Sequence, residues 1–301
     1  MGPPDATILL TGMGRSGTTW VMDIINHKND YRTIFEPFLP SEVPEAFCFK
    51  IHHYIRPNTI DPLLERQARL ILGGNIKNKW VDIGRKRKLV YHKRIVKDIR
   101  FNLMLPWLKS LIPDMPLILL VRHPLAIAHS WEKLKMMPED PMWNDRRDFQ
   151  LILSQSALLN DYQIIRRAAN EINTSSIMET ILFIWCVLYY VPIKQLKQGD
   201  AYITTYEDLV LNPEKAFTGL FNHLGVEMDW SEIHLLFDKP SITNFLKRDF
   251  KEMEKVLLGW KSRYSKEELK RANHILRLFD LQDIYGQDGL PSKDLQGILY
   301  S

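Results

Sequence analysis

Residues 6–27 read ATILLTGMGRSGTTWVMDIINH and join a short apolar run to a helical pattern through a glycine-rich turn. The run 6–11 predicts a buried strand, and the apolar spacing within 18–27 predicts a helix. Glycines let such a turn bring its backbone N–H groups against an anion, and the helix that follows adds unpaired N–H groups and the positive end of its dipole. The stretch therefore predicts an anion-binding loop between a strand and a helix.

The turn follows the spacing of a nucleotide-binding phosphate loop, G-x-x-x-x-G-K-[ST], except at one position. Thr18 stands where that loop has the lysine that reaches the outer phosphates of a nucleoside triphosphate. We therefore expect the loop to hold an anion other than a nucleoside triphosphate. A plain strand-to-helix connection without a ligand is the alternative when this stretch is taken alone.

The composition is that of an ordinary globular protein. The chain has 301 residues, of which 45% are hydrophobic and 25% charged, and its formal net charge is +4. This length can bury a full core in one large domain or two small ones. The small positive excess suits an anionic ligand and argues against a dedicated nucleic-acid-binding protein.

Cysteine usage and hydropathy indicate a cytoplasmic protein. Cys48 and Cys186 lie far apart in apolar surroundings without metal-ligand spacing, which predicts buried thiols in a reducing compartment. The N-terminal residues lack the pattern of a secretory signal, and the apolar run 181–193 is shorter than the ~20 residues that a membrane span needs. We expect that run to form a core helix, and no membrane span.

Candidate strands alternate with candidate helices along the chain, which predicts a parallel sheet covered by helices. No linker divides the chain, so we predict a single α/β domain over residues 1–301, similar to the P-loop NTPases and carrying helical insertions. The expected strands are 6–11, 94–97, 117–121 and 201–205, and the expected helices are 18–27, 61–72, 102–111, 125–136 and 213–224, with long helical regions at 148–169 and 175–198.

A second candidate anion contact follows the strand at 117–121. Residues 117–131 read LILLVRHPLAIAHSW, so that Arg122 ends the strand and Ser130 lies about two turns into the next helix. Ligands of open α/β sheets bind at the carboxyl ends of the strands, where Arg122 is expected. A structural ion pair is the alternative role for Arg122, and we expect His123 beside it to be structural.

Together these stretches resemble the sulfotransferases that use 3′-phosphoadenosine 5′-phosphosulfate (PAPS). Their 5′-phosphosulfate loop matches residues 15–20, RSGTTW, whose arginine is closer to the carbohydrate-type than to the cytosolic branch. Their 3′-phosphate motif matches Arg122 and Ser130, and their tyrosine near the adenine matches Tyr206 in YEDL. The resemblance covers most of residues 6–226, with a 5′-phosphosulfate unit at 6–28 and a 3′-phosphate unit at 116–136.

The resemblance implies PAPS as the sulfuryl donor and a site without a metal. A C-terminal closing region, 240–301, is implied to cover the 3′-phosphate, although Asp249 replaces the glycine of the family's basic-basic-glycine triplet there. For Trp20 a core position is the alternative to stacking on the adenine. The residues implied to bind the donor are Arg15, Ser16, Gly17, Thr18, Thr19, Trp20, Arg122, Ser130, Tyr206, Lys247 and Arg248.

Arg15 and Lys97 are the candidates for charge stabilisation during sulfuryl transfer. Arg15 can bind two oxygens of the transferring group through its planar fork. Lys97 matches a lysine that the cytosolic branch places on the sulfuryl group, but Ile99 stands where that branch has its catalytic histidine. The base must therefore come from elsewhere in the chain.

Glu36 is the leading candidate for that base. It lies in IFEPF, residues 34–38, which resembles the F-E-P element of carbohydrate-type sulfotransferases. We expect its apolar surroundings to raise its pKa towards the working pH. A carboxylate paired with an arginine is the alternative, and His53 and His92 are the reserve candidates for the base.

The implied reaction is transfer of a sulfuryl group to a hydroxyl or amine of a small-molecule, carbohydrate or lipid acceptor. We expect the acceptor site to be built from residues 39–82 and 135–173. The basic stretch 85–88, with Lys93 and Arg94, is either a contact for an anionic acceptor or a solvated surface. A P-loop small-molecule kinase and a non-catalytic nucleotide-binding protein are the alternatives, and the oligomeric state stays open.

Overall fold

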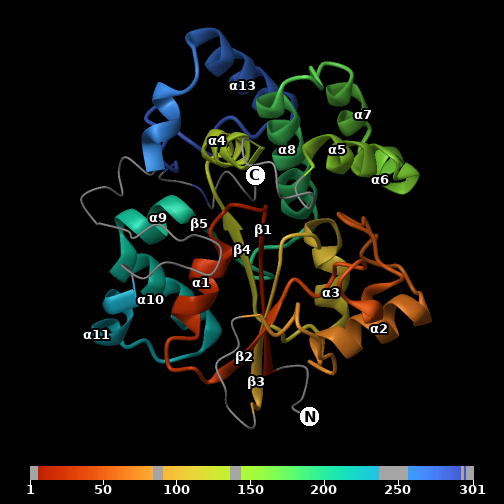
Figure 1. Cartoon of the computed structure of the whole chain (residues 1–301), viewed down its shortest axis with the longest axis vertical. Coiled ribbons are helices and arrows are strands. Elements are labelled where there is room, and N and C mark those ends of the chain that lie inside the picture. The colour runs from red at the N-terminus through yellow and green to blue at the C-terminus, as the bar shows by residue number, and fades with distance from the viewer. Residues whose placement is uncertain (1–5, 84–90, 136–143, 237–256, 293–294, 296–301) are drawn as a thin grey trace.

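A five-stranded, all-parallel sheet forms the centre of the molecule (Figure 1). The computed structural model describes residues 6–83, 91–135, 144–236, 257–292 and 295. The strand order is β2-β3-β1-β4-β5, which confirms the predicted α/β class. The strands are β1 Thr7–Gly12, β2 Tyr31–Phe35, β3 Lys93–Asp98, β4 Leu117–Val121 and β5 Tyr202–Thr205.

Both faces of the sheet are buried. In β1, Leu9 belongs to one hydrophobic core, whereas Ile8 and Leu10 belong to the other; in β4, Leu119 and Leu120 divide in the same way. Successive side chains of a strand point to opposite faces, so each strand contributes to both cores. This explains why the strands are nearly continuous apolar runs in the sequence.

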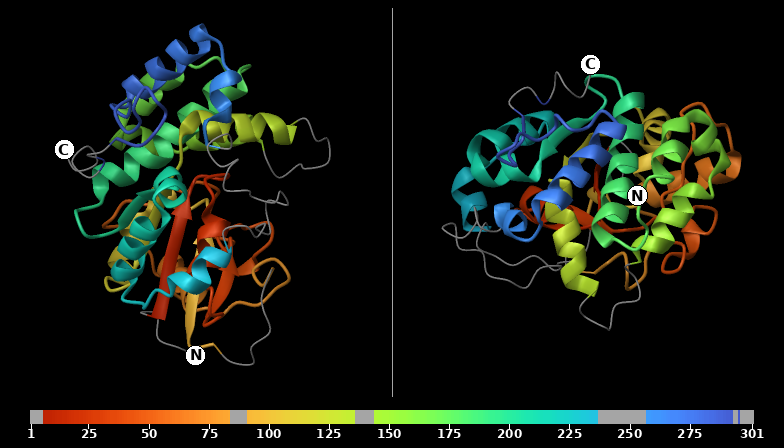
Figure 2. Two further views of the ribbon diagram at one scale, coloured as in Figure 1. Left: turned by 90° about the vertical axis from the view of Figure 1, so that its left-hand side faces the viewer. Right: turned by 90° about the horizontal axis from the view of Figure 1, so that it is seen from above.

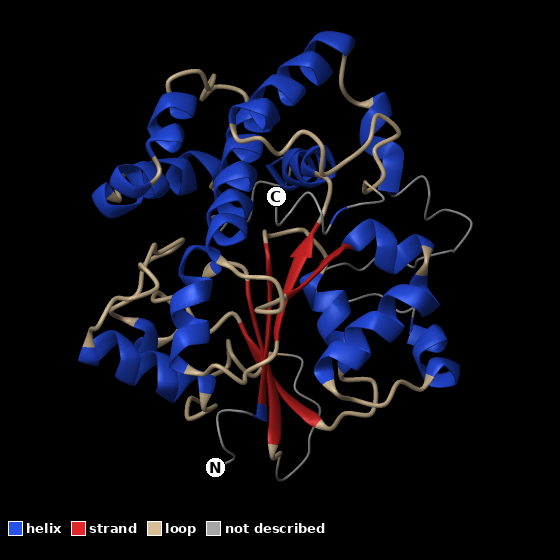
Figure 3. Ribbon diagram, turned by 180° about the vertical axis from the view of Figure 1, so that it is seen from behind, coloured by secondary structure: helices blue, strands red, loops and turns tan. Residues whose placement is uncertain are grey.

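Helices cover the two faces of the sheet, as Figures 1 and 3 show. Their apolar residues belong to the core of the face that they cover. One face carries α1 Thr18–Ile25, α9 Tyr206–Leu211, α10 Pro213–Leu224 and α11 Trp230–Ile233, and the other carries α2 Pro62–Leu72 and α3 Leu105–Leu111. Short 3₁₀ turns are η2 Pro44–Ala46, η3 Asn102–Met104, η4 His234–Leu236 and η6 Gly259–Ser262.

A further layer of helices lies beyond the carboxyl ends of the strands (Figure 2). α8 packs against α4, α5 and α13 in this layer. It is long and apolar enough to cross a membrane, but 83% of its most apolar window is buried, which confirms the core helix predicted around 181–193. The layer consists of α4 Pro124–Lys135, α5 Asp145–Leu153, α6 Ser156–Asp161, α7 Gln163–Ala169, α8 Ile177–Gln195 and α13 Lys266–Leu278.

Strand β2, like helices α11 and α13, is an element that the sequence pattern did not reveal. Its sequence YRTIF contains two polar residues in five, yet all five are buried at the sheet edge. The Arg32 guanidinium donates to the carbonyls of Gly74 and Ile76 and pairs with Asp82 at 3.0 Å. These partners come from the connection after α2, so only the folded chain makes Arg32 compatible with a buried strand.

Two helical expectations also need correction. The long helical region expected at 148–169 is three helices, α5 to α7, with breaks at Ser154–Gln155 and at Tyr162. Residues 206–211 form α9, a helix that was not expected. The Thr205 hydroxyl caps its start by accepting from the Asp208 N–H at 3.1 Å. The remaining predicted elements are present, with ends shifted by a few residues.

The two cysteines are free thiols, and they differ in exposure. Cys186 is fully buried in α8, as predicted, whereas Cys48 is only partly buried, so the prediction of a buried thiol was wrong there. Burial raises the pKa of both thiols. The cytoplasmic location stays a prediction.

Candidate functional site

The site lies where the strand order reverses. From β1 the chain continues to β2 and β3 on one side of the sheet, and from β4 it continues to β5 on the other. The carboxyl ends of the neighbouring strands β1 and β4 therefore open into one crevice, the usual ligand position in such sheets. The glycine-rich loop leaves β1 here, and Arg122 follows β4 directly.

Close packing explains the two glycines that bound the loop. Gly17 has φ 100° and is the N-cap of α1, which has no side-chain cap on its first N–H groups. A Cβ atom at Gly17 would lie 2.6 Å from the Tyr206 ring, and one at Gly12 would lie 2.5 Å from the Leu120 carbonyl oxygen. The uncapped N–H groups at the start of α1 are thus available to an anion.

Helix α8 holds the start of the loop in place. The Tyr189 hydroxyl donates to the Leu120 carbonyl at 2.8 Å and accepts from the Met13 N–H at 3.0 Å. Tyr189 is fully buried, so both hydrogen bonds form away from water. One side chain therefore fixes the distance between the end of β4 and the loop after β1.

The loop and the segment after β4 bring three predicted donor-binding residues together. Arg15 Nε donates to the Ser130 hydroxyl at 3.0 Å, and Arg122 Nη1 donates to the Arg15 carbonyl at 2.9 Å. Within the described chain neither arginine forms a salt bridge with a carboxylate. Burial and the charge of Arg122 both lower the pKa of Arg15. Two neighbouring guanidinium groups without a carboxylate partner are typical of an anion site.

Orphaned polar atoms at the same place point to a ligand. Among the described residues, neither the buried Ser16 hydroxyl nor the buried Nε of Arg122 has a hydrogen-bond partner. Buried donors are normally satisfied, and an exception often marks the position of an ion or ligand. Thr18 and Thr19 lie beside them at the start of α1, each about 4% exposed. The residues present thus fit the phosphate groups of a nucleotide.

Trp20 and Tyr206 are core residues next to this site. Each is 2% exposed, and their rings meet edge to face at 5.5 Å, while Trp20 also contacts Phe217 at 5.7 Å. The Arg122 guanidinium lies 4.5 Å from the centre of the Tyr206 ring. Trp20 therefore occupies a core position, which was the alternative to stacking on an adenine. The Tyr206 ring packs against the Arg122 guanidinium in a cation–π contact.

Glu36 has a lowered pKa, and the expectation of a raised one was wrong. Burial raises the pKa of this carboxyl, but Lys97 and Arg100 lower it further than burial raises it. Lys97 Nζ lies 2.6 Å from Glu36 Oε1, and Arg100 donates to Glu36 Oε2. Glu36 therefore has the alternative role, that of a carboxylate paired with an arginine. Two cations hold it as an anion.

The same cluster accounts for Lys97 and for Asp98. Lys97 is 2% exposed and lies 4.4 Å from the centre of the Phe35 ring as well as beside Glu36. Asp98 is fully buried and accepts from the backbone N–H groups of Phe38 and Arg100, and burial raises its pKa to about 6. Arg100 itself had no signal in the sequence beyond its place two residues after a strand.

His53 and His92, the reserve candidates for the base, differ in their surroundings. His53 packs against Phe49, and burial together with the charge of Lys50 lowers the pKa of His53 to about 4. His92 is exposed beside β3. Arg94, expected in a basic surface stretch, is instead buried and donates to the Thr7 hydroxyl. Lys93 of that stretch is exposed. Residues 85–88 and the predicted nucleotide contacts Lys247 and Arg248 lie outside the described residues.

The C-terminal segment docks on the residue next to Arg122. The Trp260 ring stacks on the His123 ring at 4.0 Å, and the Tyr285 hydroxyl donates to Glu207, which also accepts from the His123 N–H. Burial and the charges of Lys261 and Arg122 lower the pKa of His123 to about 3. His123 is thus a neutral packing residue that brings residues 257–292 close to the candidate anion site.

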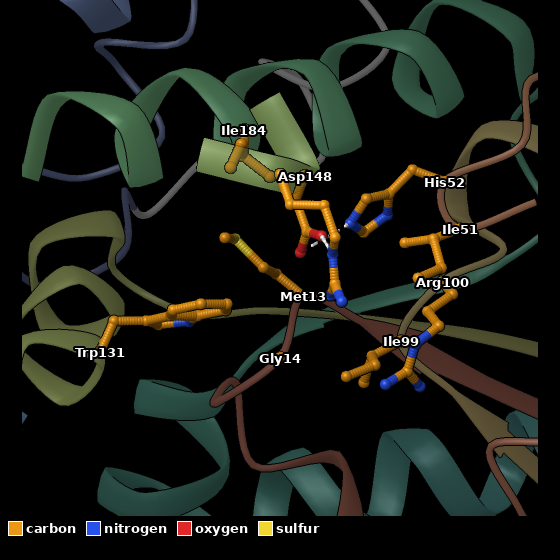
Figure 4. A pocket seen from close by; sticks show the side chains of 10 residues that line it. Met13, Gly14, Ile51, His52, Ile99, Arg100, Trp131, Asp148 and Ile184 are labelled. Carbon is orange, nitrogen blue, oxygen red and sulfur yellow. Dashed lines mark hydrogen bonds and ion pairs between the residues drawn. The ribbon is translucent and has the colours of Figure 1, made fainter. Parts of the chain in front are cut away.

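A small cavity above the glycine-rich loop contains residues that sequence reasoning missed (Figure 4). We refer to it as the loop cavity. Its volume of about 20 Å³ has room for one water-sized group. It is lined by Met13, Gly14, Ile51, His52, Ile99, Arg100, Trp131, Arg147, Asp148 and Ile184. His52 and Asp148 come from segments far apart in sequence, so no spacing could have paired them.

The sequence matches a known protein family over most of its length. Residues 7–232 match the family model described as "Sulfotransferase family". No curated protein matches the chain in a sequence search. Among the described residues, no group of three or more His, Cys, Asp or Glu side chains could hold a metal ion.

Three similar solved structures illustrate the range of the structural matches. The sulfotransferase domain of the Synechococcus PCC 7002 olefin synthase is 17% identical, with a TM-score of 0.49, over 91% of this chain and 93% of that one. Mouse sulfotransferase SULT7A1 complexed with PAP is 13% identical, with a TM-score of 0.46, over 92% and 85%. Retinol dehydratase in complex with androsterone and the inactive cofactor PAP is 13% identical, with a TM-score of 0.45, over 93% and 82%.

Proposed function

The chain belongs to the sulfotransferase family, and we propose that it transfers a sulfuryl group from PAPS to a hydroxyl of a small-molecule or lipid acceptor. The observation that carries this proposal is the meeting of Arg15, Ser130 and Arg122 at the carboxyl ends of β1 and β4. A donor with phosphate groups at both its 5′ and 3′ positions needs two anion contacts on one nucleotide. The loop after β1 and the segment after β4 supply them side by side.

Each proposed contact has a physical role. The N–H groups at the start of α1 and the unpartnered Ser16 hydroxyl suit the 5′-phosphosulfate. Arg122, whose Nε has no hydrogen-bond partner among the described residues, suits the 3′-phosphate. Arg15 lies between the two and would neutralise the charge that develops on the leaving oxygen as the S–O bond breaks. The carbohydrate-like subtype of the loop remains a proposal.

The loop cavity suggests the chemistry of the acceptor. It adjoins Gly14, next to Arg15, and two of its walls come from the stretches 39–82 and 135–173 that were expected to build the acceptor site. Apolar side chains form much of its wall, from Met13, Ile51, Ile99, Trp131 and Ile184. The cavity itself has room only for the reacting hydroxyl. We propose that this hydroxyl is carried on an apolar skeleton, because a carbohydrate would bring further polar groups against the apolar side chains around it.

Binding of adenosine 3′,5′-bisphosphate (PAP), the product of the donor, tests the proposal first. Titration calorimetry on the whole chain is expected to show saturable, one-to-one binding that needs no added metal. Absence of heat at millimolar PAP would contradict the proposal. Magnesium-dependent ATP turnover without PAP binding would instead favour the P-loop kinase, and PAP binding without transfer to any acceptor would favour a non-catalytic nucleotide-binding protein.

The two arginines are expected to fail in different ways. Arg122→Ala should weaken PAP binding by roughly 10- to 100-fold, because it removes a charge-assisted hydrogen bond of about 1.5–3 kcal/mol. Arg15→Ala should leave PAP binding closer to wild type and lower kcat by about 10²-fold or more, because its charge acts mainly on the transition state. Calorimetry and turnover of labelled PAPS separate the two. Small and equal effects would show that the site is misassigned.

A further inference from the structure

The loop cavity contains a histidine and a carboxylate that face one another (Figure 4). His52 Nε2 lies 3.7 Å from Asp148 Oδ2, and the two side chains are 7% and 11% exposed. His52 comes from the connection after β2, and Asp148 comes from α5. Within the described residues the other ring nitrogen, Nδ1, is buried without a hydrogen-bond partner.

The loop cavity is small, and the glycine-rich loop and the histidine–carboxylate pair both line it. It has room for about one water-sized group, and its lining includes His52, Asp148 and the loop residue Gly14. Gly14 precedes Arg15 in the loop that is proposed to hold the phosphosulfate. An acceptor oxygen placed here therefore has the donor loop on one side and an imidazole on the other.

We propose that His52 is the general base that takes the proton from the acceptor, and that Asp148 is the positioning residue that stabilises the imidazolium formed. This inference rests on the proposed sulfotransferase function. The acceptor oxygen forms a bond to sulfur while its proton moves to His52 Nε2. The bond from sulfur to the 5′-phosphate oxygen breaks, and PAP leaves with the electron pair. The proton then passes from His52 to solvent.

The charges around His52 suit this role. Asp148 and Arg147 face it from α5, and Arg100 faces it from the segment after β3. Burial raises the pKa of Asp148, but His52 and Arg147 lower it below its ordinary value. Asp148 is thus an anion beside the nitrogen that would gain a proton. Each cation is balanced by an acid, since Arg147 Nε lies 3.2 Å from Asp148 Oδ1 and Arg100 pairs with Glu36.

Glu36 does not compete for the role of base. Lys97 and Arg100 hold both its oxygens and lower its pKa, so it is a weak proton acceptor. His52 has no such pair of cations on its ring nitrogens. An imidazole nitrogen that no cation holds can accept a proton from the acceptor.

The backbone at His52 is held in a costly conformation. Its φ is 54°, in the left-handed region that non-glycine residues rarely adopt. Gln155 fixes this turn, because its side chain donates to the His52 carbonyl at 2.8 Å and accepts from the Tyr54 N–H at 2.8 Å. Arg15 and Glu36 also have positive φ values, of 74° and 43°. Backbone strain of this kind tends to collect at functional sites.

Three variants test the proposal, with the neighbouring histidine as a matched control. His52→Gln and Asp148→Asn change the pair, and His53→Gln changes a histidine that packs on Phe49 and does not line the loop cavity. PAP calorimetry on each variant, and on the wild type, first reports folding and donor binding, which none of the changes should alter. A wild type that binds no PAP, or binds it without transferring or hydrolysing PAPS, overturns the proposed function itself.

The rate assay uses labelled PAPS with 1-octanol, with 4-nitrophenol and with water alone. His52→Gln is expected to lower transfer to the alcohol and hydrolysis by about 10²-fold or more. It should affect 4-nitrophenol less, because a substantial fraction of that phenol is already ionised near neutral pH and needs no base. Asp148→Asn should cost about tenfold, and His53→Gln should leave all three rates unchanged.

The pH profile distinguishes catalysis from a structural role. Wild-type transfer to the alcohol should fall along an acidic limb of the pH profile, because a protonated base cannot take the proton of the acceptor. Asp148→Asn should move this limb to lower pH, since the anion that favours the imidazolium is gone. Equal losses with alcohol and phenol, a full rate in His52→Gln or an equal loss in His53→Gln would each overturn the proposal.

Discussion

At the scale of single residues, the glycine-rich loop depends on Gly17. Its φ of 100° and the Tyr206 ring, 2.6 Å from where a Cβ atom would lie, both exclude a side chain. Gly17 therefore allows two things at once. It permits the turn that exposes the N–H groups of α1, and it leaves room for the Tyr206 ring that packs against Arg122. Gly225 offers a comparison, because its φ is 62° and nothing lies within 4 Å of its Cβ position.

Gly17→Ala is expected to lose PAP binding and stability together, whereas Gly225→Ala should lose only stability. The left-handed backbone costs each alanine about 1–2 kcal/mol, and only at Gly17 must the Tyr206 ring also move. Urea denaturation and calorimetry measure the two effects. Wild-type PAP affinity in Gly17→Ala would show that the loop does not contact the nucleotide.

At the scale of elements, helix α8 contacts both the glycine-rich loop and the loop cavity. Tyr189 of α8 bridges the end of β4 and the start of the loop, while Ile184 of α8 lines the loop cavity. A helix that the sequence marks only as apolar thus sets the distance between two loops. Because α8 is buried, water does not compete for the Tyr189 hydrogen bonds that set the spacing between these two loops.

Tyr189→Phe is expected to lower the free energy of unfolding by about 1–3 kcal/mol, because it leaves the Met13 N–H and the Leu120 carbonyl without their partner in a buried place. PAP affinity should fall as well, since the loop loses its anchor. Tyr190→Phe, one residue along the same helix and only partly buried, is the control and should change neither quantity. Unaltered PAP affinity in Tyr189→Phe would show that the loop holds its shape unaided.

At the scale of the whole molecule, the C-terminal segment stabilises the fold through a buried neutral histidine. His123 stacks on Trp260 and its pKa is lowered to about 3, below the ordinary value of about 6.5. Between these pH values the unfolded chain takes up a proton that the folded chain does not. The free energy of unfolding therefore falls as the pH decreases through this window.

His123→Gln is expected to reduce this pH dependence. One proton taken up only by the unfolded chain lowers the free energy of unfolding by about 1.4 kcal/mol per pH unit. The loss of stability from pH 7 to pH 5 should therefore be about 2 kcal/mol smaller in the variant than in the wild type. Urea denaturation at both pH values measures the difference. The same loss in both proteins would show that His123 is protonated in the folded state.

Local patterns predicted the backbone of the site well. The glycine spacing, the apolar strand before it and Arg122 at the end of another strand each depend on a few consecutive residues. These short-range rules led to the parallel sheet and to two of its proposed anion contacts. Strand β2 escaped them, because Arg32 becomes compatible with a buried strand only through the carbonyls of Gly74 and Ile76.

The chemistry of individual groups was decided by the tertiary structure. The sequence by itself determined that a loop after one strand and an arginine after another should meet an anion, since backbone conformation follows from neighbours in the chain. It could not show that Lys97 and Arg100 lower the pKa of Glu36, or that Asp148 faces His52. A pKa depends on charges and burial through space, and those are set only when distant elements pack together.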